Sequence, residues 1–153
     1  MSFISSTATL QISSPSFHSK ELIPSKFTCE GENINPALLI RNIPEKTLTL
    51  ALIVDDPDAP GGTFDHWIVW NIRPVEKIPE RSIPGTEGIN GFGKTHYKGP
   101  CPPSGTHRYF FKVFALDTSL NIPAGSAKQT LEKAMKGHIL ASGELVGLYN
   151  KTK

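Results

Sequence analysis

The sequence has few cysteines and nothing that marks it for export. Only Cys29 and Cys101 are present, too few for a disulfide-dense scaffold or a four-ligand zinc site. Residues 1–14 are rich in serine and threonine, and they lack the basic start and continuous apolar stretch of a signal peptide. We therefore expect a cytoplasmic protein with two reduced thiols. Only the fold determines whether these two cysteines lie close together.

Long apolar runs and an excess of one charge are also missing. No stretch approaches the roughly 18 apolar residues of a membrane span, since even residues 48–54 are interrupted by Thr49 and followed by Asp55. Lys and Arg number 16 against 14 Asp and Glu, a net charge of +2 with no basic run. Binding to a phosphate backbone or an anionic membrane relies on clustered positive charge. We expect a soluble protein that neither binds nucleic acid nor inserts into a membrane.

The residues that are present are typical of one β-rich domain. A chain of 153 residues with 38% hydrophobic content has the size of a single domain with one core, so residues 1–153 are expected to form one domain. Proline and glycine, 13 of each, separate short apolar runs, as in β-structure joined by ordered loops. Composition and alternation predict strands at residues 9–13, 37–42, 47–55, 66–72, 108–116 and 143–149.

One helix is predicted, beginning at Ser126. Ser126 and Gln129 have the spacing of a capping box, in which each side chain satisfies a free backbone N–H group, and Gly137 is the expected stop. The apolar residues of the segment fall on one face at helical spacing: Ala127, Leu131, Ala134 and Met135. The long connection at residues 73–98 is rich in proline and glycine, and loops of this length are often functional or ordered by their own packing.

Two clusters concentrate residues that are costly to bury. Residues 56–62 (DPDAPGG) precede a strand that starts near His66, and residues 97–106 precede one that starts at His107. In both, a loop stiffened by proline adjoins the strand. Rigid loops and strand ends predict a preformed site.

The side chains of these clusters match an oxyanion or phosphate site. Alternation puts His107 and Tyr109 on one face of their strand, and His66 meets them if the two strands are neighbours. The histidines would then supply ring N–H donors, Tyr109 a hydroxyl, and the loop around Cys101 backbone N–H groups. Asp56 would orient an imidazole.

Each of these residues also has a plainer interpretation. Asp56 and Asp58 are good turn formers before proline. His66 lies beside a tryptophan, which is typical of a core histidine. His107 lies beside Arg108, which is typical of the surface. Cys101 lies between prolines and is typical of a small packed residue. Their combination on two rigid loops nevertheless favours a site. We interpret it as a binding module for a small phosphorylated or carboxylated ligand, not an enzyme, with no cofactor or metal.

Two alternatives belong to other classes. Asp56, one of the two histidines and Cys101 have the residue types of a thiol hydrolase. Two histidines and one aspartate also match a facial metal triad.

At this point the sequence resembles a known family. DPDAP followed by HW, and Y-x-G-P-C-P-P-x-G-x-H-R-Y at residues 97–109, are similar to the two signature regions of the phosphatidylethanolamine-binding protein family. The similarity runs end to end and includes residues 137–147. It is greatest for the bacterial and archaeal Raf kinase inhibitor-like branch.

The resemblance implies a mainly β fold, a β-sandwich of two antiparallel sheets with one or two peripheral helices. It also implies an anion pocket that in relatives accepts phosphate, acetate, cacodylate or a phospholipid head group. Carried over by position, the ligand-binding residues are Asp56, Asp58, His66, Cys101, Pro103, His107 and Tyr109.

Further expectations follow from the same resemblance. Ala59–Pro60 is a candidate cis peptide bond, and Phe64 is expected at an apolar rim. A homodimer is expected, as is a role in regulating or inhibiting a kinase or protease through a phosphorylated or acidic group on the partner. This sequence departs from the animal relatives at Cys101, where they have glycine.

Overall fold

Two β-sheets and one helix make up the structure, a computed structural model that describes residues 8–151. The large sheet has the strand order β1 (Ala8–Thr9), β9 (Ile139–Tyr149), β8 (His107–Leu116), β4 (Thr49–Asp56), β5 (Phe64–Ile72), β7 (Thr86–Glu87). The small sheet has the order β2 (Gln11–Ser13), β3 (Leu38–Arg41), β6 (Lys77–Ile78). Neighbouring strands are antiparallel except for the short parallel pair β1 and β9. The predicted mainly β fold of two sheets is confirmed.

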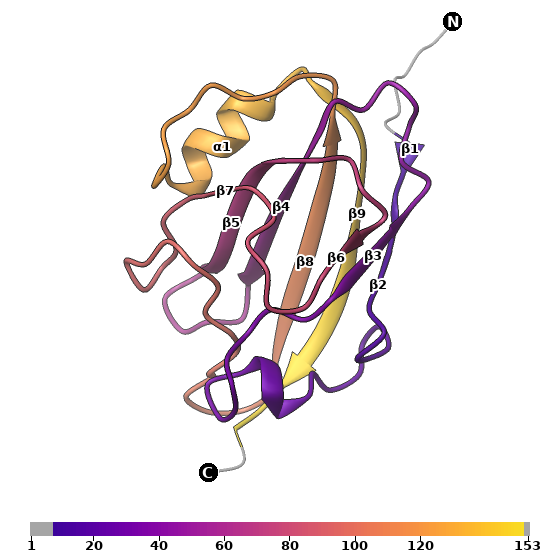
Figure 1. Cartoon of the computed structure of the whole chain (residues 1–153). Helices are drawn as coiled ribbons and strands as arrows, with labels where there is room; N and C mark the ends of the chain where they lie inside the picture. Colours follow the sequence, from indigo (N-terminus) through magenta and orange to yellow (C-terminus); the bar gives the residue numbers. More distant parts are fainter. Residues whose placement is uncertain (1–7, 152–153) are drawn as a thin grey trace, which may run out of the picture.

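The layers follow from alternation along the central strand β4, in which every residue is buried. Leu50, Leu52 and Val54 face the small sheet and belong to the core between the two sheets. Ala51 and Ile53 face the other way. Figure 1 shows the small sheet on one side of the large sheet and α1 (Lys128–Met135) on the other. A second core lies beneath this helix, centred on Leu131 and Met135.

Several local predictions needed correction. Residues 9–13 do not form one strand, because residue 10 separates β1 from β2 and the two pair in different sheets. The predicted capping box is wrong: the N-cap of α1 is Ala127 and has no side-chain cap. The Ser126 hydroxyl instead donates to the Pro123 carbonyl at 2.6 Å, so the serine side chain stabilises the turn before the helix. The connection at residues 73–98 contains β6 and β7.

No cis peptide bond occurs among residues 8–151, so the predicted cis Ala59–Pro60 bond is wrong. The trans form is the more stable isomer before proline. Here the turn closes by a bond from the Gly62 N–H to the Ala59 carbonyl at 3.1 Å, with Gly62 at a φ of 112°. Such a φ suits glycine, because it has no Cβ.

The prediction of two reduced thiols is also wrong, since Cys29 and Cys101 form a disulfide with a Cα–Cα distance of 5.5 Å. Hydrogen bonds hold the two segments together beside it. The Tyr97 hydroxyl donates to the Phe27 carbonyl at 2.7 Å, and the Cys29 N–H donates to the Pro100 carbonyl at 3.1 Å. The thiols meet because the loop before β8 packs on the segment after the short 3-10 helix Ser25–Phe27.

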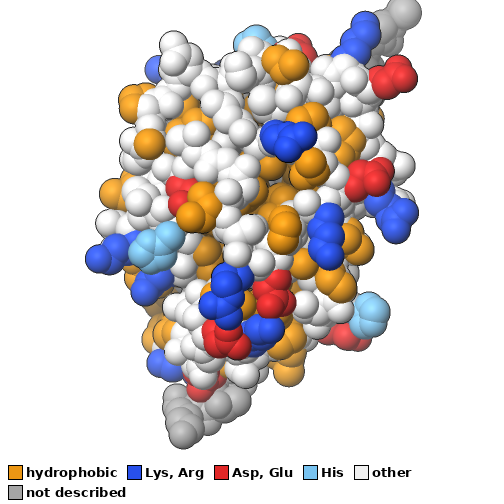
Figure 2. Space-filling model, viewed as in Figure 1, with side chains coloured by type: hydrophobic (Ala, Val, Ile, Leu, Met, Phe, Trp, Pro, Cys, Tyr) orange, Lys and Arg blue, Asp and Glu red, His pale blue; other side chains and the backbone are white. Residues whose placement is uncertain are grey.

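Charged side chains of both signs lie side by side on the face drawn in Figure 2. Two ion pairs between exposed side chains join Lys26 to Glu80 and Arg81 to Glu32. Within residues 8–151, no helix combines the length and apolar character needed to cross a membrane.

Candidate functional site

A cavity of about 210 Å³ opens where three adjacent strands of the large sheet begin or end. Strand β4 runs antiparallel to both of its neighbours, β5 and β8. Its last residues therefore lie beside the first residues of those two strands. The polar side chains of the lining come from these positions: Asp56, His66, His107 and Tyr109.

The structure brings the two predicted clusters together, but by a different pairing. Strands β5 and β8 are not neighbours, because β4 lies between them and contributes Asp56. The rings nevertheless converge: His66 and Tyr109 have centroids 5.3 Å apart, and His107 and Tyr109 have centroids 6.4 Å apart. Antiparallel pairing on both sides of β4 is the physical reason for this convergence.

Asp56 has the two functions that the sequence offered as alternatives. One carboxylate oxygen accepts the backbone N–H of Asp58 at 2.7 Å, which closes the turn after β4. The other lies 2.7 Å from His107 Nδ1, in a pair whose side chains are 4% and 9% exposed. This bond orients the imidazole and leaves Nε2 as the ring nitrogen that a ligand can reach.

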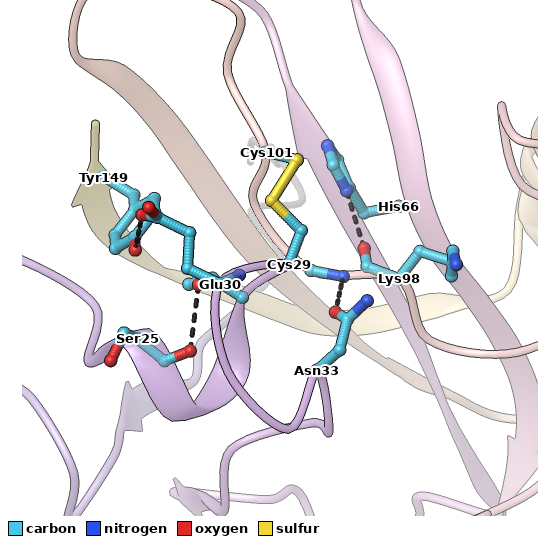
Figure 3. Close-up of a disulfide and its surroundings, with 10 residues drawn as sticks. Ser25, Cys29, Glu30, Asn33, His66, Lys98, Cys101 and Tyr149 are labelled. Atoms are coloured by element: carbon cyan, nitrogen blue, oxygen red, sulfur yellow. Dashed lines mark hydrogen bonds between the residues drawn. A yellow bond between two sulfur atoms is a disulfide. The ribbon is translucent and has the colours of Figure 1, made fainter. Parts of the chain in front are cut away.

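His66 is oriented by a backbone carbonyl. Its Nδ1 lies 2.7 Å from the Lys98 carbonyl oxygen. Figure 3 shows this hydrogen bond, with the second ring nitrogen directed away from that carbonyl. A carbonyl oxygen only accepts, so Nδ1 carries a proton. Burial lowers the pKa of His66 below its ordinary value, although the Lys98 carbonyl and the Asp56 carboxylate favour the charged form.

Tyr109 is the clearest donor in the cavity. Burial raises the pKa of its hydroxyl well above the ordinary value, and the charge of Asp56 raises it further. The hydroxyl therefore stays protonated. Its proton is within hydrogen-bonding reach of the Asp56 carboxylate and has to turn from that carboxylate to donate to an anionic ligand.

The walls of the cavity are apolar, and one of their residues was missed in the sequence. Phe92 packs edge-on against Phe64, with centroids 4.8 Å apart, and both rings contact His66. Phe64 is part of the cavity lining. The remaining apolar lining comes from the two loops: Ala59, Pro60, Pro102 and Pro103. Phe92 lies between two glycines of the long connection, a position without strand or helix periodicity to indicate it.

Asp58, in contrast, does not line the cavity. Its carboxylate accepts the backbone N–H of Arg108 at 2.9 Å and two guanidinium bonds at 2.9 and 2.8 Å. The guanidinium hydrogen bonds lower the pKa of Asp58 to about 2. Asp58 thus joins the loop after β4 to the start of β8. This contact stabilises two segments that line the cavity, although Asp58 itself is not in the lining.

Cys101 lines the cavity, and its sulfur is bonded to Cys29. A thiol hydrolase requires a free thiolate, so the disulfide overturns that alternative. Within residues 8–151, no group of three His, Cys, Asp or Glu side chains is placed to hold a metal ion. The facial triad therefore has no counterpart among these residues.

Comparisons with known proteins agree with the motifs. The family model described as phosphatidylethanolamine-binding protein matches residues 13–150. A UPF0098 protein of Pyrococcus abyssi is 53% identical over 146 residues, covering 88% of this chain and 82% of the relative. A similar protein of Pyrococcus horikoshii is 51% identical over 154 residues, covering 94% and 77%.

Two solved structures have the same architecture. The crystal structure of a phosphatidylethanolamine-binding protein homolog from Chlamydia trachomatis superimposes with a TM-score of 0.90 at 39% identity, covering 95% of this chain and 99% of that one. The structure of E. coli YbcL, described as a new member of the mammalian family, gives a TM-score of 0.86 at 30% identity, covering 95% and 100%.

Proposed function

Because the chain belongs to the phosphatidylethanolamine-binding protein family, we propose that the cavity at the ends of β4, β5 and β8 binds a small anion and performs no catalysis. The ligand is phosphate, or a small molecule with a phosphate or carboxylate group. A phosphorylated or acidic side chain on a partner protein presents the same group, which is how such a site would regulate a kinase or protease.

The observation that carries this proposal is the arrangement of Tyr109, which stacks on the ring of His107, beside the Asp56–His107 pair. The tyrosine hydroxyl keeps its proton, and the carboxylate holds the imidazole in one orientation. Both face a preformed cavity with mostly apolar walls. A few fixed polar groups in an apolar cavity are typical of small-ligand sites.

The test is phosphate titration of a matched pair of tyrosine variants by isothermal calorimetry. Tyr109→Phe removes only the hydroxyl, and we expect it to weaken phosphate binding about tenfold to a hundredfold, since a hydrogen bond to a charged group contributes about 1.5–3 kcal/mol. Tyr149→Phe makes the same change on β9 outside the cavity lining and should leave the affinity unchanged. No binding of phosphate or phosphoethanolamine at millimolar concentration to the parent protein would refute the proposal.

A further inference from the structure

His66 presents an acceptor, not a donor, to the cavity. Its Nδ1 proton is held by the Lys98 carbonyl at 2.7 Å, and a second bond from the Lys98 N–H to the His66 carbonyl at 3.3 Å keeps the two residues together. In the neutral imidazole the other nitrogen, Nε2, then carries a lone pair. Within residues 8–151, Nε2 has no hydrogen-bond partner.

The surroundings of His66 disfavour the charged form of the ring. The residue is 4% exposed and is enclosed by Phe64, Phe92 and Tyr109. Burial therefore lowers the pKa of His66, against the opposing charges of the carboxylates on β4 and β5, namely Asp56, Asp55 and Asp65. The other titratable groups nearby are the Tyr109 hydroxyl, whose pKa is raised, His107, which is paired to Asp56, and the amine of Lys98, which lies 5.8 Å from the centre of the Phe92 ring.

The charge of the cavity favours a singly charged ligand. No lysine or arginine is among the described residues that line it, and the nearby Arg108 is bound to Asp58. The lining instead includes the carboxylate of Asp56. A doubly charged anion would meet little compensating charge, whereas a singly charged one would meet less repulsion.

We propose that the site selects oxyanions that carry a proton. The ligand O–H donates to His66 Nε2, while an ionised oxygen accepts from the Tyr109 hydroxyl. The ligand class is the monoanion of a phosphate monoester, phosphonate or phosphate. Sulfate monoesters and sulfonates have the same shape and charge but no proton, so they place a lone pair against Nε2. This inference rests on the proposed anion binding at the cavity and narrows it to phosphorylated ligands, since an ionised carboxylate has no proton for Nε2.

Methyl phosphate and methyl sulfate make a matched pair of probes. Their monoanions have the same net charge and shape, but only the methyl phosphate monoanion carries an O–H proton. By calorimetry at pH 6 and constant ionic strength, we expect methyl phosphate to bind about a hundredfold tighter, as expected where a buried polar group loses its partner. Above the second ionisation of the ester, near pH 6, its affinity should fall about tenfold per pH unit, since one proton is linked to binding.

A substitution of His66 tests the contribution of its Nε2 atom. His66→Asn keeps an amide donor for the Lys98 carbonyl but has no atom in place of Nε2, so the preference for methyl phosphate should fall to severalfold or less. Comparable binding of methyl sulfate to the parent protein, with or without the same pH dependence, would overturn the inference and leave anion binding intact, since the proton would then reside on a histidine. If neither methyl phosphate nor inorganic phosphate binds, the proposed function fails and this inference with it.

Discussion

Reduction of the Cys29–Cys101 disulfide should remove a large part of the folding stability. The bond closes a loop with a sequence separation of 72 residues. In the chain-entropy account, a loop of this length restricts the unfolded chain by about 15 cal/mol/K, equivalent to about 4 kcal/mol at room temperature. Domains of this size have a total stability of about 5–15 kcal/mol, so the reduced protein should be markedly less stable.

The folded structure should nevertheless survive reduction under mild conditions. The same two segments are joined by the Tyr97–Phe27 bond, the Cys29–Pro100 bond and a bond from the Gly99 N–H to the Asn33 side chain at 2.7 Å. The effect therefore lies mainly in the unfolded state, where the open chain gains freedom and exposes more surface. A larger dependence on urea should accompany the loss of stability.

Urea unfolding of the oxidised protein, the reduced protein and a Cys29→Ser, Cys101→Ser double variant measures this effect. The reduced protein and the double variant should agree with each other, and reductant should have no effect on the double variant. A difference below about 1 kcal/mol between oxidised and reduced protein would contradict the loop-entropy reasoning. Alkylation of two thiols in the protein unfolded without reductant would contradict the disulfide itself.

Two further substitutions test the packing of α1 and the loop after β4. Leu131→Ala should cost about 2–5 kcal/mol in urea unfolding, because Leu131 of α1 is fully buried in the core between the helix and the large sheet; a loss below about 1 kcal/mol would show that the helix contributes little to the core. Arg108 lowers the pKa of Asp58 from 3.8 to about 2, so this pair stabilises the fold fully above about pH 4 and the contribution is lost as the pH falls towards 2. The parent should therefore lose more stability over that range than Asp58→Asn, and equal losses would show that the pair adds nothing measurable.

The amino-acid sequence by itself determined the long strands and most of the residues that line the cavity. Strands were predictable because buried strands such as β4 and β8 carry β-branched and aromatic residues in runs that local pattern detects. The two loop motifs identified the family and placed Asp56, His66 and Tyr109 in one site. These features depend on residues close together in the chain.

Only the tertiary structure decided how these parts meet. It placed β4 between β5 and β8, brought Phe92 to the cavity wall, and bound Asp58 to Arg108 outside the cavity lining. It also joined the two cysteines and assigned the His66 proton to Nδ1, through carbonyls and side chains tens of residues away. Strand order, disulfide pairing and the protonated nitrogen of a histidine depend on contacts between distant segments, and local residue patterns carry no record of those contacts.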